Sequence, residues 1–98
     1  MSWTVILEDE NKVEVASLNN EFVINSFNEI VNNENFKLIR YLDPYGDAVF
    51  NHLQMQDLIS DLENLTKIDR NNQLVVEIIS LAKRCIEESH LYLVFYGD

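Results

Sequence analysis

The sequence predicts an α+β fold, with a mostly antiparallel sheet of four to five strands and two helices packed on one face. Three observations predict it. Strand-like alternation marks the first residues, two apolar stripes with helical spacing occupy residues 55–85, and an apolar run fills residues 91–96. Strands early, helices late and a returning strand are typical of this class. The 98 residues predict a single domain, 1–98, because a second would be too small to hold its own core.

The first third of the chain predicts a hairpin followed by short elements. In residues 3–8, Trp3 and every second residue after it are apolar, which indicates a strand with Trp3 in the core. Residues 9–12 are polar turn formers, and residues 13–16 alternate as a second strand. Residues 22–24 look extended, whereas the apolar spacing of residues 27–31 favours a short helix with Ser26 as its N-cap.

The middle of the chain predicts a strand, a tight turn and another strand. Residues 36–42 read as a strand that ends at Asp43, because the residue before a proline is pushed out of helical space. The segment Asp43-Pro44-Tyr45-Gly46 matches the residue preferences of a type I turn. Residues 48–50 then form a short strand.

Two amphipathic helices follow. The first has an apolar stripe with polar residues Asp57, Asp61, Glu63 and Asn64 on the opposite side; the stripe consists of Met55, Leu58, Ile59, Leu62 and Leu65. The second is capped by Asn71 or Asn72; its stripe consists of Leu74, Ile78, Leu81, Ala82 and Cys85, widened by Val75 and Ile79.

The closing segment, residues 91–96, is apolar or aromatic on both faces. That pattern indicates a strand inside the sheet rather than at an edge. Tyr92 and Tyr96 share one face of this strand. If no helix covers that face, the two rings form an aromatic patch suited to protein contact; the alternative is ordinary packing.

The charge distribution restricts the partners. The net charge is −10, and residues 1–34 hold seven carboxylates and a single basic residue, Lys12. Phosphate binding requires clustered Lys and Arg, so neither nucleic acid nor a membrane is an expected partner. A basic protein would be attracted, although solubility alone is an alternative explanation of the charge. One cysteine, Cys85, and the lack of a signal or spanning segment predict a cytoplasmic protein.

Six residues around the turn are the candidate binding site. They are Arg40, Asp43, Tyr45, Asp47, Asn51 and His52. Turn formation accounts for Asp43, whose carboxylate can accept a backbone N–H two residues later, but not for Tyr45, Asp47 or Asn51. Arg40 can pair with Asp43 or Asp47 beside the turn. The segment is therefore either a structural corner or a binding surface.

The sequence predicts no catalytic residue, metal site or cofactor. Asp43, Asp47 and Asn51 lack the central glycine and closing Glu of a calcium loop. Cys85 lies on an apolar helix face, and neither His52 nor His90 has a nucleophile at a suitable spacing. A glycine-rich phosphate loop is missing as well.

The segment from Phe36 to Leu53, together with the ending from His90 to Asp98, resembles a family of small bacterial proteins without an assigned activity. Members have a similar length, open on Ser-Trp-Thr as residues 2–4 do, and share a core of the type Arg-Tyr-Ile/Leu-Asp-Pro-Tyr-Gly-Asp-Thr-Val-Phe-Asn, which corresponds to residues 40–51. Ala48 replaces the usual Thr and His52 the common Arg, so a site role of that Thr hydroxyl does not carry over. The resemblance implies a shared fold and a bacterial origin, but no activity.

Three functional hypotheses follow. The first is a non-enzymatic protein-binding module, in its concrete form an inhibitor or immunity-type protein that neutralises a basic partner such as a nuclease toxin. The second is a small-molecule or enzymatic site beside the turn, with Arg40 holding an anion and Asp47 or His52 carrying a proton. The third is a structural subunit that forms a homodimer through its sheet.

Overall fold

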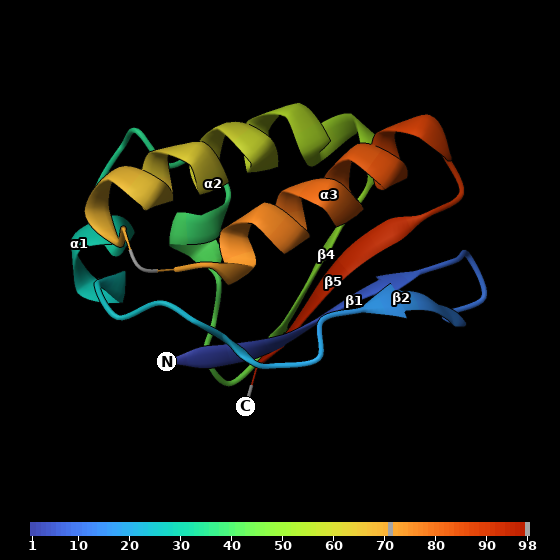
Figure 1. Cartoon of the computed structure of the whole chain (residues 1–98), viewed down its shortest axis with the longest axis horizontal. Helices are drawn as coiled ribbons and strands as arrows, with labels where there is room; N and C mark the ends of the chain where they lie inside the picture. Colours follow the sequence, from blue (N-terminus) through green and yellow to red (C-terminus); the bar gives the residue numbers. More distant parts are fainter. Residues whose placement is uncertain (71, 98) are drawn as a thin grey trace.

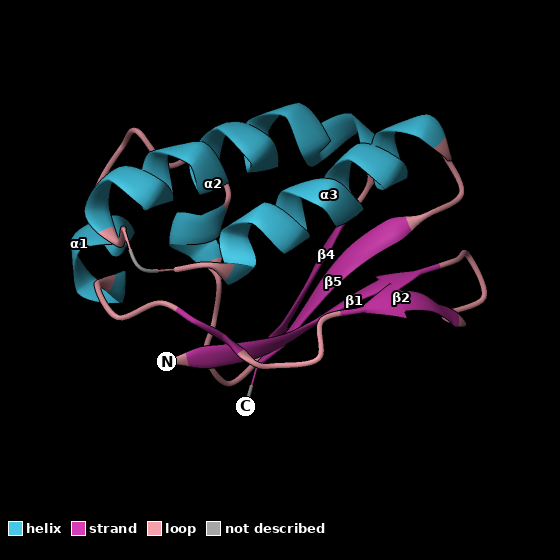
Figure 2. Ribbon diagram, in the orientation of Figure 1, coloured by secondary structure: helices cyan, strands magenta, loops and turns pink. Residues whose placement is uncertain are grey.

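The structure, a computed structural model that describes residues 1–70 and 72–97, confirms the predicted α+β class. Figure 1 shows a sheet with the two long helices on one face, and Figure 2 separates helices from strands by colour. In chain order the elements are β1 (Ser2–Glu8), β2 (Glu14–Ser17), β3 (Phe22–Val23), α1 (Phe27–Val31), the 3₁₀ helix η1 (Ile39–Tyr41), β4 (Asp47–Phe50), the 3₁₀ helix η2 (His52–Gln54), α2 (Met55–Ile68), α3 (Leu74–Glu87) and β5 (Tyr92–Gly97).

All strand pairs of the described sheet are antiparallel. The strand order is β2-β1-β5-β4, and β3 also pairs with β1. The closing strand therefore lies inside the sheet, as its apolar pattern predicted. β1 and β5 pair from Trp3 opposite Gly97 to Glu8 opposite Tyr92, which covers the whole of β5. The middle of the sheet is thus built from the two ends of the domain.

The core lies between the sheet and the helices. Every second residue of β1, beginning with Trp3, is buried toward the helices. The residues beside them in β5 and β4 that are also buried are Leu93, Phe95 and Phe50. Both predicted helical stripes face this core, although Ile59 of α2 and Leu74, Ile79 and Leu81 of α3 are only half-buried. The buried helical side chains are Met55, Leu58, Leu62, Leu65, Val75, Ile78, Ala82 and Cys85. None of the helices in the described residues lies on the opposite face of the sheet (Figure 1).

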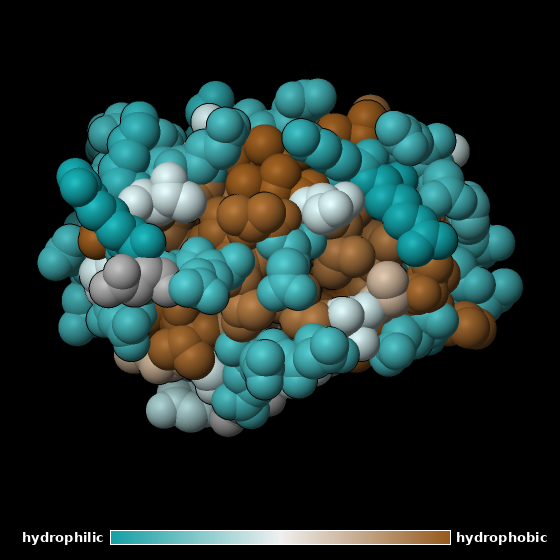
Figure 3. Space-filling model, in the orientation of Figure 1, coloured by the Kyte–Doolittle hydropathy of each residue, from teal (hydrophilic) through white to brown (hydrophobic). Residues whose placement is uncertain are grey.

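α3 carries apolar side chains beyond those that the core covers. Val76 is exposed, and Leu74, Ile79, Leu81 and Ile86 are half-buried. Figure 3 shows brown apolar atoms gathered over α3, bordered by hydrophilic residues. None of the helices in the described ranges is long and apolar enough to cross a membrane.

The predicted strand over residues 36–42 is wrong. Phe36, Ile39 and Leu42 are buried at intervals of three residues, which is the repeat of a 3₁₀ helix. The apolar residues that suggested a strand instead belong to a helical turn, η1, which packs against α1. Alternation is a weak guide here because two adjacent apolar residues, Leu38 and Ile39, are half-buried and buried, whereas a half-buried strand would expose one of them.

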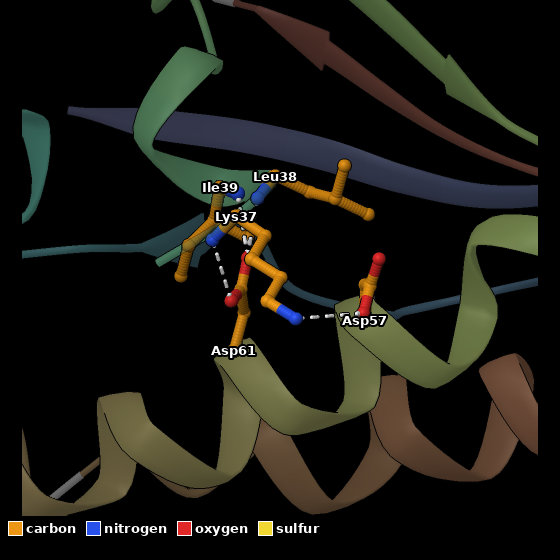
Figure 4. A network of polar contacts seen from close by, with 5 residues as sticks. All are labelled: Lys37, Leu38, Ile39, Asp57 and Asp61. Carbon is orange, nitrogen blue, oxygen red and sulfur yellow. Dashed lines mark hydrogen bonds and ion pairs between the residues drawn. The ribbon is translucent and has the colours of Figure 1, made fainter. Parts of the chain in front are cut away.

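Asp61 explains this local structure and corrects a second prediction. It was expected to face away from the core, yet it is buried on α2. Its carboxylate accepts the backbone N–H groups of Lys37, Leu38 and Ile39 at 2.7–3.0 Å, as Figure 4 shows. A helix start has N–H groups without internal partners, and a carboxylate satisfies them. α2 therefore supplies the cap for the start of η1.

The predicted helix caps are only partly found. Ser26 occupies the N-cap position of α1, but its hydroxyl makes no capping hydrogen bond. Gln73, not Asn72, is the N-cap residue of α3. Asn72 instead donates from its amide to the carbonyl of Val23, at 2.9 Å. Asn71, the other predicted cap, lies outside the described residues.

Candidate functional site

The Asp43–Gly46 segment is a tight turn, as its residues predicted. The N–H of Gly46 donates to the carbonyl of Asp43 at 3.2 Å, and the N–H of Tyr45 donates to the Asp43 carboxylate at 2.9 Å. The indole N–H of Trp3 also donates to the carbonyl of Asp43, at 2.9 Å. Local hydrogen bonding thus accounts for Asp43 and fixes the turn against the sheet.

The backbone of β5 at Gly97 packs directly against the backbone of the turn. Gly97 donates its N–H to the carbonyl of Gly46 at 2.8 Å. A Cβ atom on Gly97 would lie 2.6 Å from the Pro44 carbonyl oxygen and 2.5 Å from that of Gly46. These contacts leave no room for a side chain at residue 97, so the turn and β5 form one rigid corner.

The other candidate residues beside the turn do not converge. The guanidinium of Arg40 lies 5.3 Å from the centroid of the Tyr41 ring, and in the described part of the chain it makes no ion pair with Asp43 or Asp47. Asn51 caps η2, where its side chain accepts the N–H of Leu53 at 3.0 Å. His52 is half-buried in η2, and Tyr45 is 88% exposed.

A hollow of about 290 Å³ lies on the helix-free face of the sheet. Of the six candidate residues, only Asp47 lines it. The hollow is lined by Glu8, Asp9, Glu10, Lys12, Asp47, Val49, Tyr92, Val94 and Tyr96. Four carboxylates against one ammonium leave its lining with a formal charge of −3. The predicted tyrosine patch of Tyr92 and Tyr96 therefore faces a hollow and not the helices.

A hydrogen bond between two strands crosses the floor of this hollow. The phenol of Tyr96 donates to the carboxylate of Glu8. Tyr96 is paired with Thr4 and Glu8 with Tyr92, so this bond crosses the pair of Ile6 and Val94 that lies between them. Val94 is only 2% exposed, although this face has no helix. The floor is thus apolar beneath a polar bridge.

The bridge determines the protonation of Tyr96. The hydrogen bond to Glu8, helped by burial and by the negative charges of Glu8 and Asp47, raises the pKa of Tyr96 to about 12. The phenol is therefore held neutral and cannot act as a base near neutral pH. Carboxylates beside tyrosine rings instead form an environment that binds cations, by charge and by cation–π attraction.

Cys85 has an environment that suppresses its reactivity. The thiol is buried and lies 3.2 Å from the carbonyl of Leu91, to which it donates. Burial raises the pKa of the Cys85 thiol, which lowers the fraction of reactive thiolate. In the described ranges, no group of three His, Cys, Asp or Glu side chains is arranged to hold a metal ion.

No family model, no curated protein and no solved structure matches the chain. Sequence reasoning identified Asp47 and the shared face of Tyr92 and Tyr96, but it missed Glu8. The available signal was the alternation of β1. Since Leu7 is buried toward the helices, the next residue, Glu8, points to the helix-free face. Its bond to a tyrosine 88 residues away has no local signature.

Proposed function

We propose that the protein is a non-enzymatic binding module for a basic partner protein, and that the helix-free face of its sheet is the binding surface. The observation that carries the proposal is the acidic hollow in which four carboxylates border Tyr92 and Tyr96. Tyrosine is enriched in protein interfaces, and complementary charge accelerates association. In its concrete form the module is an inhibitor or immunity-type protein of a bacterial cytoplasm.

The chemistry of the hollow supports a cationic side chain as the group that it accepts. Its carboxylates exceed its one ammonium, and aromatic rings such as those of Tyr92 and Tyr96 also attract the charge of a Lys or Arg. Asp47 and Glu10 are exposed, so they remain free to meet a partner in solution. Glu8 is occupied by Tyr96 and serves to shape the floor.

The test compares two double variants with the same change in net charge. Asp47→Asn/Glu10→Gln removes two carboxylates from the hollow, whereas Glu77→Gln/Glu87→Gln removes two exposed carboxylates from α3. The probe is a short synthetic peptide with two Lys residues separated by one Thr and flanked by Thr, and a Glu-for-Lys peptide is the control. Binding is measured by isothermal titration calorimetry at low and at physiological ionic strength.

We expect binding of the Lys peptide that weakens as salt screens the charges. The hollow variant should lose most of this binding, and the α3 variant should retain it. Equal losses in both variants would show that only the overall charge matters, and binding of the Glu peptide would contradict the proposal outright.

A homodimer is the second candidate, favoured by the apolar side chains over α3 (Figure 3). Apolar patches on a surface commonly mark contacts between proteins. Sedimentation equilibrium would give the mass in solution. A dimer that dissociates in Val76→Lys would support this candidate, and a monomer at all accessible concentrations would remove it.

A further inference from the structure

The edge of the sheet at β4 has backbone groups without a partner strand. In the described part of the chain β4 pairs with β5 alone. Gly97 donates to Gly46, so the pair of residues 46 and 97 is hydrogen-bonded. Bonded and non-bonded pairs alternate in an antiparallel ladder. The N–H and C=O groups of Asp47 and Val49 therefore point away from β5, toward the open edge.

The two edges of the sheet differ in their protection. At the other edge, the pairing of β1 with β2 shifts register between Leu7 and Glu8, a bulge that disrupts further strand addition. The pairing of β4 with β5 runs without a shift over all four residues. Val49, on this edge, is 60% exposed and also lines the acidic hollow. β4 is thus the regular, accessible edge, and it borders the hollow.

We propose that an extended segment of the basic partner adds to the sheet beside β4, antiparallel to it, and places a Lys or Arg opposite Asp47. This inference rests on the proposed function and specifies its mode of binding. Main-chain hydrogen bonds to Asp47 and Val49 hold the segment, and the alternation of side chains directs its basic residue to the helix-free face, beside the hollow.

A second copy of this chain is a poor occupant of the same edge. An antiparallel pair of β4 strands that uses the outward groups of Asp47 and Val49 places each Asp47 opposite the Val49 of the other copy. The two Asp47 side chains are then diagonal neighbours on one face, where like charges repel. Each copy also has a net charge of −10, which opposes association further. A basic segment relieves both effects.

The decisive experiment is an N-methyl scan of the Lys peptide on the unchanged protein. Methylation of both Lys backbone nitrogens removes the donors that face Asp47 and Val49, and we expect at least about tenfold weaker binding. Methylation of the intervening Thr nitrogen, which points away from β4, should change the affinity by less than about twofold. Equal sensitivity at all positions would overturn the proposal.

A variant of the protein gives a second test. Val49→Pro removes the outward N–H without breaking the ladder to β5, and proline is tolerated on edge strands. We expect about tenfold weaker binding than in Val49→Thr, which keeps the N–H. If Val49→Pro does not fold, the N-methyl scan alone decides. Loss of binding in Asp47→Asn/Glu10→Gln with no N-methyl pattern would overturn strand addition and leave the acidic binding surface standing.

Discussion

The indole N–H of Trp3 donates a 2.9 Å hydrogen bond to the main-chain carbonyl of Asp43, 40 residues further along the chain. The bond joins β1 to the Asp43–Gly46 turn. It has a structural reason, since Trp3 is fully buried and the indole N–H, the only polar group of its side chain, needs an acceptor.

Trp3→Phe should lower the free energy of unfolding by about 2–4 kcal/mol, because it removes this donor and leaves a cavity in the core. Urea denaturation followed by far-ultraviolet circular dichroism measures the change. Tyr45→Phe, at an exposed position in the same turn, should stay within about 0.5 kcal/mol. A Trp3→Phe protein as stable as the wild type would show that the turn does not depend on the indole.

Asp61→Asn should destabilise the protein by about 3 kcal/mol. Three backbone N–H groups converge on the Asp61 carboxylate, and the amide would present its own N–H₂ to part of this cluster. Asp57→Asn is the matched control, one turn earlier on α2. Asp57 pairs with Lys37 at 3.5 Å on the surface, a contact that contributes about 0–1 kcal/mol. Similar losses in the two variants would refute the capping role of Asp61.

Gly97→Ala should destabilise by about 3 kcal/mol, since its methyl group would meet the backbone oxygens of Pro44 and Gly46, which cannot move independently of the corner. Gly46→Ala should cost about 1 kcal/mol, because the nearest atom, 2.9 Å away, belongs to the Asp43 side chain and can shift. Thermal unfolding of both variants tests the order. A larger loss of stability in Gly46→Ala than in Gly97→Ala would mean that the backbone around Gly97 shifts to accept a methyl group.

The stability should fall in alkali through Tyr96. The pKa of Tyr96 is raised from 10.0 to about 12 in the folded protein, so the contribution of its neutral phenol is complete below pH 10. It is then lost as the pH rises toward about 12. The difference in unfolding free energy between wild type and Tyr96→Phe should therefore shrink across this interval.

Spectrophotometric titration provides an independent check on Tyr96. The phenolate absorbance that develops near pH 12 should be missing from Tyr96→Phe. Glu8→Ala, which removes both the acceptor of the phenol hydrogen bond and the neighbouring negative charge, should bring the ionisation of Tyr96 back toward 10. An unchanged titration in Glu8→Ala would exclude Glu8 as the cause of the raised pKa.

The elements with strong periodicity could be predicted from the sequence. The apolar stripes of α2 and α3 and the two-sided apolar pattern of β5 are visible in the local sequence. They indicate both the type of each element and which of its faces are buried. Residues 36–42 were wrongly predicted as a strand, since their structure depends on Asp61, which lies on a helix more than 20 residues away. The sequence of α2 alone gives no sign that Asp61 is buried, because an Asp beside an apolar stripe normally faces solvent.

The candidate site was predictable to a similar degree. The pattern of β5 placed Tyr92 and Tyr96 on a common face, and the turn residues of 43–46 explained Asp43. The hollow itself depends on how β1, β4 and β5 align, which is set by long-range pairing. Asn51 illustrates the opposite case, a polar residue beside a conspicuous turn whose side chain serves as a helix cap.

The pairing of β1 with β5 has a kinetic consequence. The strands that form the middle of the sheet are separated by nearly the whole domain, so the chain must close a very large loop before these two strands can pair. Loop closure costs entropy before its contacts are gained, and proteins dominated by distant pairings cross a correspondingly higher barrier. Circular permutation that links residue 97 to residue 2 would make this pairing local, and it should accelerate refolding while preserving the native packing.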